Sequence, residues 1–267
     1  MLLESPAMTI RKLTTVLLLM FLTGVAIAEE SPVAPQGQAR GELYIKVSTG
    51  LGLTRDSDLE IRQADPAGNT GLTFFDVAWE DNSLSGPSAR YTTVRVGYFF
   101  KERPWLGMAV EFMHFKVFAE VDRMVRVQGT NVGVPIDTVQ PMSAIVERYI
   151  IGNGVNFIPV TVVARKRLKQ SERFPHGRLQ PYAGFGLGPT LLYTQSTVNG
   201  KRRGGPYELG SVGIQALGGL QFHLSRSWDL FAEYKYTFTQ ANGSIDDGSS
   251  RTDLFTDHFT AGVGLHF

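Results

Sequence analysis

The sequence predicts an all-β chain that folds as an eight-stranded, up-and-down, antiparallel transmembrane β-barrel with long extracellular loops. Three observations support this prediction. The last twelve residues, TDHFTAGVGLHF, alternate strictly between apolar side chains and small or polar ones. Such alternation is typical of a strand whose two faces meet lipid and lumen. Seven earlier stretches have the length of membrane-crossing strands, and the composition is rich in glycine (29 residues) and aromatic residues (11%).

The N-terminal residues 1–28 have the three parts of a secretory signal peptide. Arg11 and Lys12 form a basic region, a short apolar run follows, and an Ala-Ile-Ala sequence supplies the cleavage signal. The apolar run is too short to cross a membrane as a helix. We therefore expect residues 29–40 to be a flexible periplasmic lead-in and residues 41–267 to form the barrel domain.

Overall composition excludes several classes of protein. The chain has 26 basic and 25 acidic residues, and a charge so close to neutrality argues against a nucleic-acid binder. Cysteine is absent, which rules out disulfides and thiolate metal sites. Outside the signal segment no apolar run reaches 18 residues, so a helical membrane protein is also excluded.

The strands are predicted from their alternation and from the turn residues between them. In order they span 41–53, 90–100, 105–118, 145–164, 179–193, 207–224, 228–240 and 253–267. An even number places both chain ends on the periplasmic side. The long connections 54–89 and 119–144 and the shorter ones near 198–203 and 241–252 then lie outside the cell, as in outer-membrane barrels.

Three details of these elements remain open at the level of sequence. Phe74, Phe75 and Trp79 in the first connection suggest a hairpin extension beyond the membrane. The alternation of the third strand slips near Met113-His114, which predicts a bulge or the point where the strand leaves the bilayer. Pro159 lacks a backbone donor, so the parity of the fourth strand is unclear.

Charged residues inside the barrel are the main candidates for a site. The side chains that face inward by strand parity are Lys46, Arg95, Glu111, Glu233 and Lys235. They suit either a proton or ion pathway or a structural network, and the network is favoured because buried charges require partners. An eight-stranded barrel has just enough interior for its own side chains.

The sequence contains no complete catalytic or cofactor-binding motif. The run Gly184-x-Gly186-x-Gly188 continues as a strand, whereas a phosphate-binding loop needs a helix after it. Asp257 and His258 hint at a lipid A hydrolase, but the deacylase motif is missing and the five histidines are single. The sequence therefore predicts no enzyme activity and assigns no catalytic, cofactor-binding or metal-ligating residue.

Two basic segments are candidates for phosphate contacts. Lys201, Arg202 and Arg203 would face lipopolysaccharide outside, and residues 165–178 would lie near anionic lipid headgroups on the periplasmic side. Ordinary solvated loop charge explains both segments equally well.

Several segments resemble a known family. PYAGFGLGP (181–189), LFAEYKYTF (230–238), FTAGVGLHF (259–267) and GYFFKERPWLGMAVEF (97–112) are similar to the Gram-negative outer-membrane β-barrel family of the OmpA/opacity type. The basic segment 165–178 departs from the usual pattern. The resemblance implies that Phe267 is part of the signal read by the barrel assembly machinery.

These expectations lead to a functional prediction. The chain is expected to be a monomeric protein of the cell outer membrane with a structural or interaction role, such as envelope integrity, adhesion or surface binding through its loops. Its expected partners are membrane lipid, lipopolysaccharide, periplasmic chaperones, the assembly machinery and ligands of the host or envelope; no nucleic acid and no cofactor is expected. The alternatives are a lipid A-modifying enzyme and a narrow pore for small solutes.

Overall fold

A computed structural model describes residues 41–80 and 91–267 of the chain. The predicted signal peptide and lead-in, residues 1–40, lie outside the described residues. Among the described residues, no helix has the length and apolar character needed to cross a membrane.

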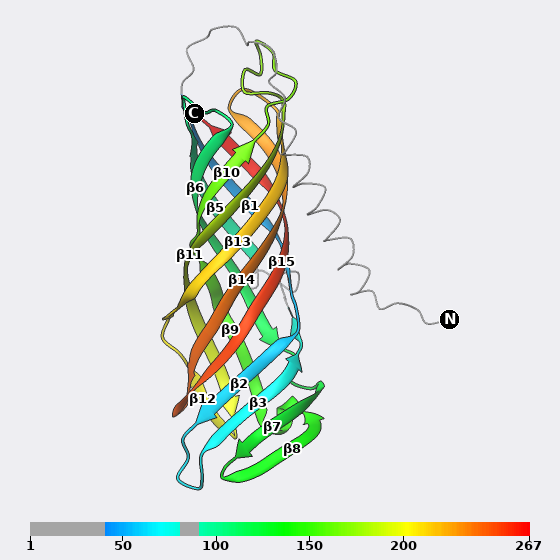
Figure 1. Cartoon of the computed structure of the whole chain (residues 1–267), viewed down its shortest axis with the longest axis vertical. Coiled ribbons are helices and arrows are strands. Elements are labelled where there is room, and N and C mark those ends of the chain that lie inside the picture. The colour runs from blue at the N-terminus through cyan, green and yellow to red at the C-terminus, as the bar shows by residue number, and fades with distance from the viewer. Residues whose placement is uncertain (1–40, 81–90) are drawn as a thin grey trace, which may run out of the picture.

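The described chain is built almost entirely of antiparallel strands (Figure 1). Their bounds are β1 Glu42–Thr54, β2 Ser57–Gln63, β3 Thr70–Val77, β4 Trp79–Glu80, β5 Tyr91–Phe99, β6 Leu106–Ala119, β7 Met124–Asn131, β8 Val134–Pro141, β9 Val146–Phe157, β10 Val160–Arg165, β11 Leu179–Val198, β12 Lys201–Gly204, β13 Glu208–His223, β14 Trp228–Ile245 and β15 Gly248–His266. A short 3-10 turn, Met142–Ala144, precedes β9.

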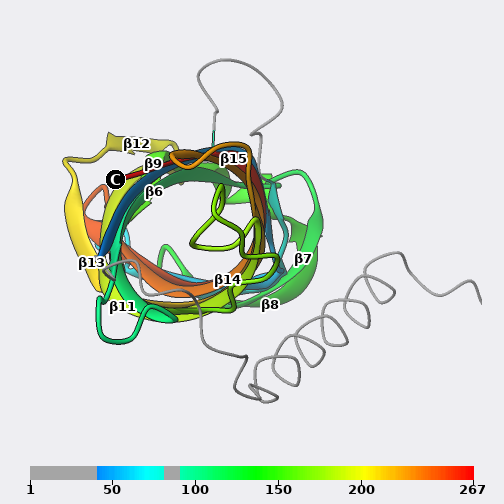
Figure 2. The same cartoon turned by 90° about the horizontal axis from the view of Figure 1, so that it is seen from above.

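Eight strand positions close the ring in the described part of the chain. Their order is β1, β5, β6, the consecutive pair β9 and β10, then β11, β13, β14 and β15. The ring closes because β15 pairs with β1 from Tyr44↔His266 to Thr54↔Thr256. Seen from above, the strands surround a central axis (Figure 2). The predicted eight-stranded antiparallel barrel is confirmed.

Side chains alternate between the inside and outside of this ring as their parity predicts. On β1, Val47 is 44% exposed while its neighbours Lys46 and Ser48 are buried. The outward apolar side chains on the other barrel strands include Val94, Val110, Val162, Phe185, Leu220 and Val263. An apolar outer band around a polar interior is the arrangement that a membrane requires.

The fourth barrel position is split by proline. The strand stops at Phe157 and resumes at Val160, so it forms β9 and β10 with Ile158 and Pro159 between them. Although Pro159 cannot donate a hydrogen bond, its carbonyl accepts one from the Glu111 amide at 3.1 Å, which keeps the two halves in line.

The irregularity expected near Met113-His114 lies slightly further along the chain. Pairing of β6 with β9 shifts between Phe115 and Val117, where β9 carries residues 152–154 opposite a single residue of β6. Gly154 in this bulge has a φ of +101°, a backbone conformation that glycine adopts readily.

Beyond the bulge, the chain builds a folded extension at the end of the barrel opposite the C-terminus (Figure 1). We call β2, β3, β7, β8 and β12, with the far ends of β6, β9, β11, β14 and β15, "the extension". The hairpin of β2 and β3 packs between β15 and β7, and the hairpin of β7 and β8 follows. The hairpin suggested by Phe74, Phe75 and Trp79 is therefore present; Phe74 and Trp79 are buried, and Phe75 is half-buried.

Two segments expected to be loops differ in the structure. Most of residues 119–144 forms the β7–β8 hairpin, and residues 241–252 belong to β14 and β15, which pair as far as Ile245↔Gly248, except for the turn at 246–247. Alternation is hard to see in the latter segment because its residues are mostly small and polar. Backbone pairing and the buried side chains of Ala241 and Ile245 hold it in the sheet.

Polarity is inverted in the extension, where the interior is apolar. Its core includes the buried side chains Leu59, Ile61, Leu72, Phe74, Met113, Phe115, Val127, Ile151, Phe157 and Leu254. Outside a membrane the outer face meets water, so burial of apolar surface inside stabilises the strands. This inversion explains why the alternation of the third strand slips at Met113.

Candidate functional site

The barrel interior is filled by three successive layers of side chains. A group of aromatic rings lies nearest the extension, ion pairs lie in the middle, and a histidine–carboxylate cluster lies at the end that holds the C-terminus. We call this last end, where the turns around 100–105, 166–178 and 224–227 gather, "the mouth".

The middle layer brings four of the five predicted interior charges together. Arg95 of β5 donates to both carboxylate oxygens of Glu233 on β14, at 2.7 and 2.8 Å, and to Glu111 on β6 at 3.0 Å. Lys235 contacts Glu111 and lies 3.2 Å from Glu233. All four residues are buried. Two positive and two negative groups therefore neutralise one another across the lumen.

Lys46, the fifth predicted charge, has different partners. Its ammonium group donates to the amide oxygen of Gln221 at 2.6 Å. It also lies 4.4 Å from the ring centre of Tyr182 and 4.7 Å from that of Phe231, which are cation–π distances. Lys46 pairs in register with Arg95, so it adjoins the ion pairs without a direct salt bridge to a carboxylate of the described residues.

The aromatic layer closes the barrel toward the extension. The ring centroids of Tyr91 and Phe115 each lie close to that of His258, at 5.3 and 4.9 Å. Thr237 holds the imidazole through its hydroxyl, 2.8 Å from Nε2. All four residues are almost completely buried. We call Tyr91, Phe115 and His258 the aromatic seal.

The structure separates the residues that hinted at a hydrolase. His258 points inward into the aromatic seal, whereas Asp257, its neighbour in the strand, accepts hydrogen bonds from Arg55 and Tyr234 instead. Successive residues of a strand face opposite sides. Asp257 and His258 therefore do not share a site.

The cluster at the mouth is centred on Glu42 of β1. Arg165 donates to it at 2.5 Å, and Nδ1 of His266 lies 2.6 Å from its other oxygen. The opposite nitrogen of His266 contacts Asp229. Nδ1 of His176, from the connection that folds over the barrel opening, lies 3.2 Å from Glu42 (Figure 2). Burial lowers the pKa of His176.

A third histidine completes this cluster. Nε2 of His223 lies 2.9 Å from the amide nitrogen of Gln180 and 2.8 Å from that of Gln221. Both amides are held in this orientation because their oxygens accept hydrogen bonds from cations, Arg165 in one case and Lys46 in the other. Two donors aimed at one nitrogen require it to be an acceptor, which means a neutral imidazole with an unprotonated Nε2.

Sequence reasoning did not find this cluster. Three of the five histidines meet here, although they lie far apart in the chain and match no ligand spacing. Their common feature is inward parity near the mouth end of a strand, as for Glu42, His223 and His266, and strand register then brings them together. Parity combined with turn positions is thus the signal that identifies them.

The remaining predicted site residues lie at the two ends of the molecule. Lys201 begins β12 in the extension and forms an ion pair with Asp65 at 2.6 Å, while Arg202 is exposed. Phe267 is 66% exposed at the mouth, and its amide donates to the carbonyl of Leu43 at 2.9 Å. The sequence-predicted residues therefore lie in three separate places: the lumen of the barrel, the extension and the mouth.

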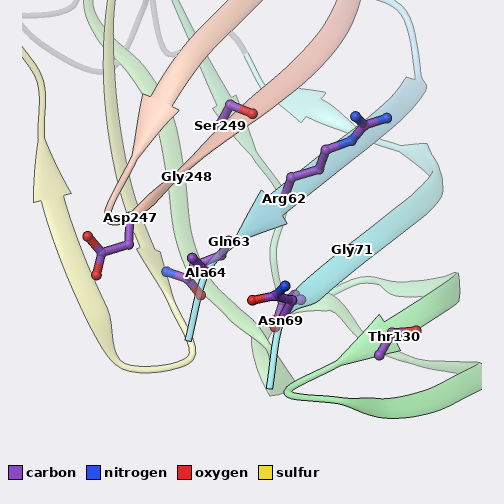
Figure 3. A pocket seen from close by; sticks show the side chains of 10 residues that line it. Arg62, Gln63, Ala64, Asn69, Gly71, Thr130, Asp247, Gly248 and Ser249 are labelled. Atoms are coloured by element: carbon purple, nitrogen blue, oxygen red, sulfur yellow. The ribbon is translucent and has the colours of Figure 1, made fainter. Parts of the chain in front are cut away.

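The extension also carries an open pocket whose lining residues are mainly of polar types (Figure 3). Arg62 and Asn69 line it from the β2–β3 hairpin, Thr130 from β7, and Asp247 and Ser249 from the β14–β15 hairpin. No single segment forms this pocket, since three hairpins must pack together to create it.

A closed ring with an apolar outer band and a filled polar interior defines a transmembrane β-barrel protein. The chain belongs to the outer membrane protein beta-barrel domain family, whose model matches residues 15–267. The expected class is thereby confirmed, and the family implies a location in the outer membrane. A comparison with curated proteins finds no match.

Several solved outer-membrane proteins are similar to the chain at low sequence identity. OprG from Pseudomonas aeruginosa is 14% identical, with 88% of this chain and 99% of that chain covered and a TM-score of 0.45. Neisserial surface protein A is 12% identical, with 85% and 100% covered and a TM-score of 0.40. The attachment invasion locus protein Ail of Yersinia pestis is 14% identical, with 85% and 99% covered and a TM-score of 0.33.

Proposed function

We propose that this protein acts at the cell surface as a non-enzymatic interaction and envelope protein, which binds its ligands through the extension. The observation that supports this most directly is the inverted polarity of the strands. Beyond the membrane band they continue as a folded β-structure with its own apolar core rather than ending in short turns. Such a core holds a binding surface in one shape before any ligand arrives, which lowers the entropic cost of binding.

The filled lumen argues against the alternative of a pore. A solute entering from the mouth meets the histidine–carboxylate cluster, then the ion pairs around Arg95, then the aromatic seal. Ion pairs whose side chains are only 0–3% exposed belong to a packed interior and do not line a water column.

An enzymatic role has little support from the arrangement of polar groups. The histidines are directed into the aromatic seal, the mouth cluster or, for His114, a contact with Asn156 at 2.8 Å. None of them lies beside a serine hydroxyl and a carboxylate in the manner of a hydrolytic triad in the described part of the chain.

The surface of the extension offers two features suited to ligand binding. One is the pocket in Figure 3, whose lining includes Arg62, Asn69 and Asp247, with the Arg62 and Asp247 side chains on opposite sides of it. The other is the outer edge of β8, which pairs only with β7 among the described strands. Val134 and Val139 on β8 are largely exposed. An exposed edge bordered by apolar side chains favours protein ligands.

Shortening the β7–β8 hairpin tests this proposal. Replacement of residues 124–141 by a short glycine-containing turn should leave the barrel folded, because these residues lie at the end of the sheet path. Cells that carry this variant should lose binding to immobilised host matrix proteins and glycans. The matched control is Glu102→Ala in an exposed turn at the mouth, which should bind as the wild type does. Equal binding by the shortened variant and the wild type would contradict the proposal.

Lipopolysaccharide is a second proposed partner of the extension. Arg202 is the most exposed of the three predicted basic residues, whereas Lys201 is engaged by Asp65. We therefore expect Arg202 with Arg203 to supply the phosphate contacts and Lys201 to have a structural role. A double Arg202→Glu, Arg203→Glu variant should bind lipopolysaccharide vesicles more weakly than a Lys201→Met variant.

A further inference from the structure

The mouth cluster brings together three side chains of types that bind metal ions. Glu42, His223 and His266 are all buried, and each offers one ligand atom within 4.8 Å of the others. They come from three different strands, β1, β13 and β15. Imidazole nitrogen and carboxylate oxygen are the ligands that divalent zinc takes when thiolates are absent.

We propose that Glu42, His223 and His266 form a binding site for a divalent transition-metal ion of the zinc class at the mouth of the barrel. Zinc binds nitrogen and oxygen at about 2.0–2.2 Å. From a triangle with sides of at most 4.8 Å, each ligand atom reaches that distance by moving less than about 1 Å.

The surroundings of His266 match those of metal-bound histidines. Its Nδ1 lies against Glu42 and its Nε2 against Asp229. Whichever nitrogen binds the ion, the other remains against a carboxylate, which fixes the ring and raises its basicity. The second oxygen of Asp229 is buried and accepts no hydrogen bond from any residue in the described ranges. One oxygen of Asp229 thus has no hydrogen-bond donor from these residues.

The charge of the cluster is consistent with a bound cation. Glu42 and Asp229 bring two negative charges, and Arg165 brings one positive charge. Without a metal, a proton on His266 balances the remainder, so a metal ion and this proton compete for the same place. Arg165 opposes the cation, and its guanidinium also donates to the carbonyl of Pro104 and stacks on the ring of Phe99.

His223 is already in the protonation state that a metal ligand needs. The fixed amides of Gln180 and Gln221 require its Nε2 to carry a lone pair. An incoming ion replaces the hydrogen bond from one of these amides. The cluster lies one side chain from solvent, because His176, which touches Glu42, is 37% exposed.

Bound metal would join strands on both sides of the barrel seam. β1 and β15 close the ring, and β13 lies two strands away from β15. A ligand that binds the folded state alone raises stability by mass action. Zinc should therefore shift the unfolding midpoint of the barrel to higher urea concentration, while calcium and magnesium, which prefer all-oxygen sites, should not.

Zinc content and urea unfolding together test the site. The full chain, purified with a tag that lacks histidine and stripped with a chelator, is given zinc alone and then desalted. Wild type should retain one zinc ion per chain, and His223→Gln and His266→Gln should lose both the zinc and the zinc-dependent shift. The control His114→Gln removes a histidine in the extension and should behave as the wild type does.

Each result decides for or against the zinc site. A wild type that holds no zinc, or a His223→Gln variant that holds as much as the wild type, overturns the proposal and leaves the cluster as a set of proton-sharing ion pairs. If His266→Gln does not fold, His223→Gln still decides, because the hydrogen-bond partners of the His223 Nε2 are neutral amides and its loss leaves no charge unpaired. Folding of each variant is checked by heat-dependent mobility on a gel.

Discussion

At the scale of single residues, strand parity determined which side chains enter the lumen, but it did not determine their partners. Lys46 and Arg95 are both inward on adjacent strands, yet only Arg95 reaches carboxylates. The difference arises because Glu111 and Glu233 lie level with Arg95, whereas Lys46 is directed toward Gln221 and aromatic rings. Partner choice depends on register across the lumen, and one strand's sequence does not contain that information.

Removal of Glu233 should destabilise the barrel. Arg95 would lose two of its three carboxylate contacts, and one buried positive charge would be uncompensated. Loss of one partner from a buried ion pair commonly costs about 3–5 kcal/mol. We expect Glu233→Ala to lower the free energy of unfolding by about this amount in a urea titration.

Two further variants show whether charge is the reason. Adding Lys235→Met to Glu233→Ala restores neutrality and should recover part of the lost free energy, because Lys235 lies beside both carboxylates. Glu102→Ala, in an exposed turn, should change stability by less than about 0.5 kcal/mol. No recovery in the double variant would mean that lost packing, and not unbalanced charge, causes the effect.

At the scale of elements, the sequence predicted the barrel strands and one hairpin of the extension, but not how the extension folds as a whole. The membrane imposes a period of two with apolar side chains outside, and this pattern is visible in the barrel strands except where it slips in the third and is interrupted by Pro159 in the fourth. In the extension the pattern is reversed, and its short strands pair with distant partners, as β2 does with β15. Leu59 and Ile61 alternate clearly, yet only the folded partner explains why they are buried.

The separate core of the extension leads to a prediction of local instability. Phe74 of β3 is fully buried there, and Phe→Ala in a core typically costs about 3–5 kcal/mol. Because the extension lies beyond the membrane band, Phe74→Ala should open it without unfolding the barrel. Limited proteolysis should cut within residues 57–77 while the heat-dependent gel shift is unchanged. Its matched control is Phe75→Ala on the opposite face of the same strand, which is less buried.

The last strand leads to a prediction about assembly. Phe267 follows β15 at the end of its outward apolar face and is mostly exposed. Its side chain is therefore accessible for binding by the insertion machinery. Deletion of Phe267 should lower the amount of folded protein in the outer membrane and increase its degradation in the periplasm. Unchanged folded protein on a heat-modifiability gel would show that the residue is not needed.

At the scale of the whole molecule, the layers of the interior act in series. The aromatic seal, the ion pairs and the mouth cluster occupy successive positions along one axis, and a solute must pass all three. Sequence reasoning predicted the middle layer from parity. It could not predict the seal, because an aromatic residue such as Tyr91 or Phe115 on an inward position looks like a break in the membrane pattern until the inversion of polarity is known.

This serial arrangement predicts that the protein does not conduct. An eight-stranded barrel has little more interior than its own side chains occupy, and its buried charges are neutralised in pairs. Wild type reconstituted in planar bilayers should therefore show negligible current. A Tyr91→Ala, Phe115→Ala variant removes two rings of the aromatic seal. The barrel should still not conduct, because the ion pairs between Arg95, Glu111 and Glu233 block the lumen. Steady single-channel current through the wild type, together with unchanged stability of Glu233→Ala, would establish that the lumen is a solvated channel and that its charges line a pathway.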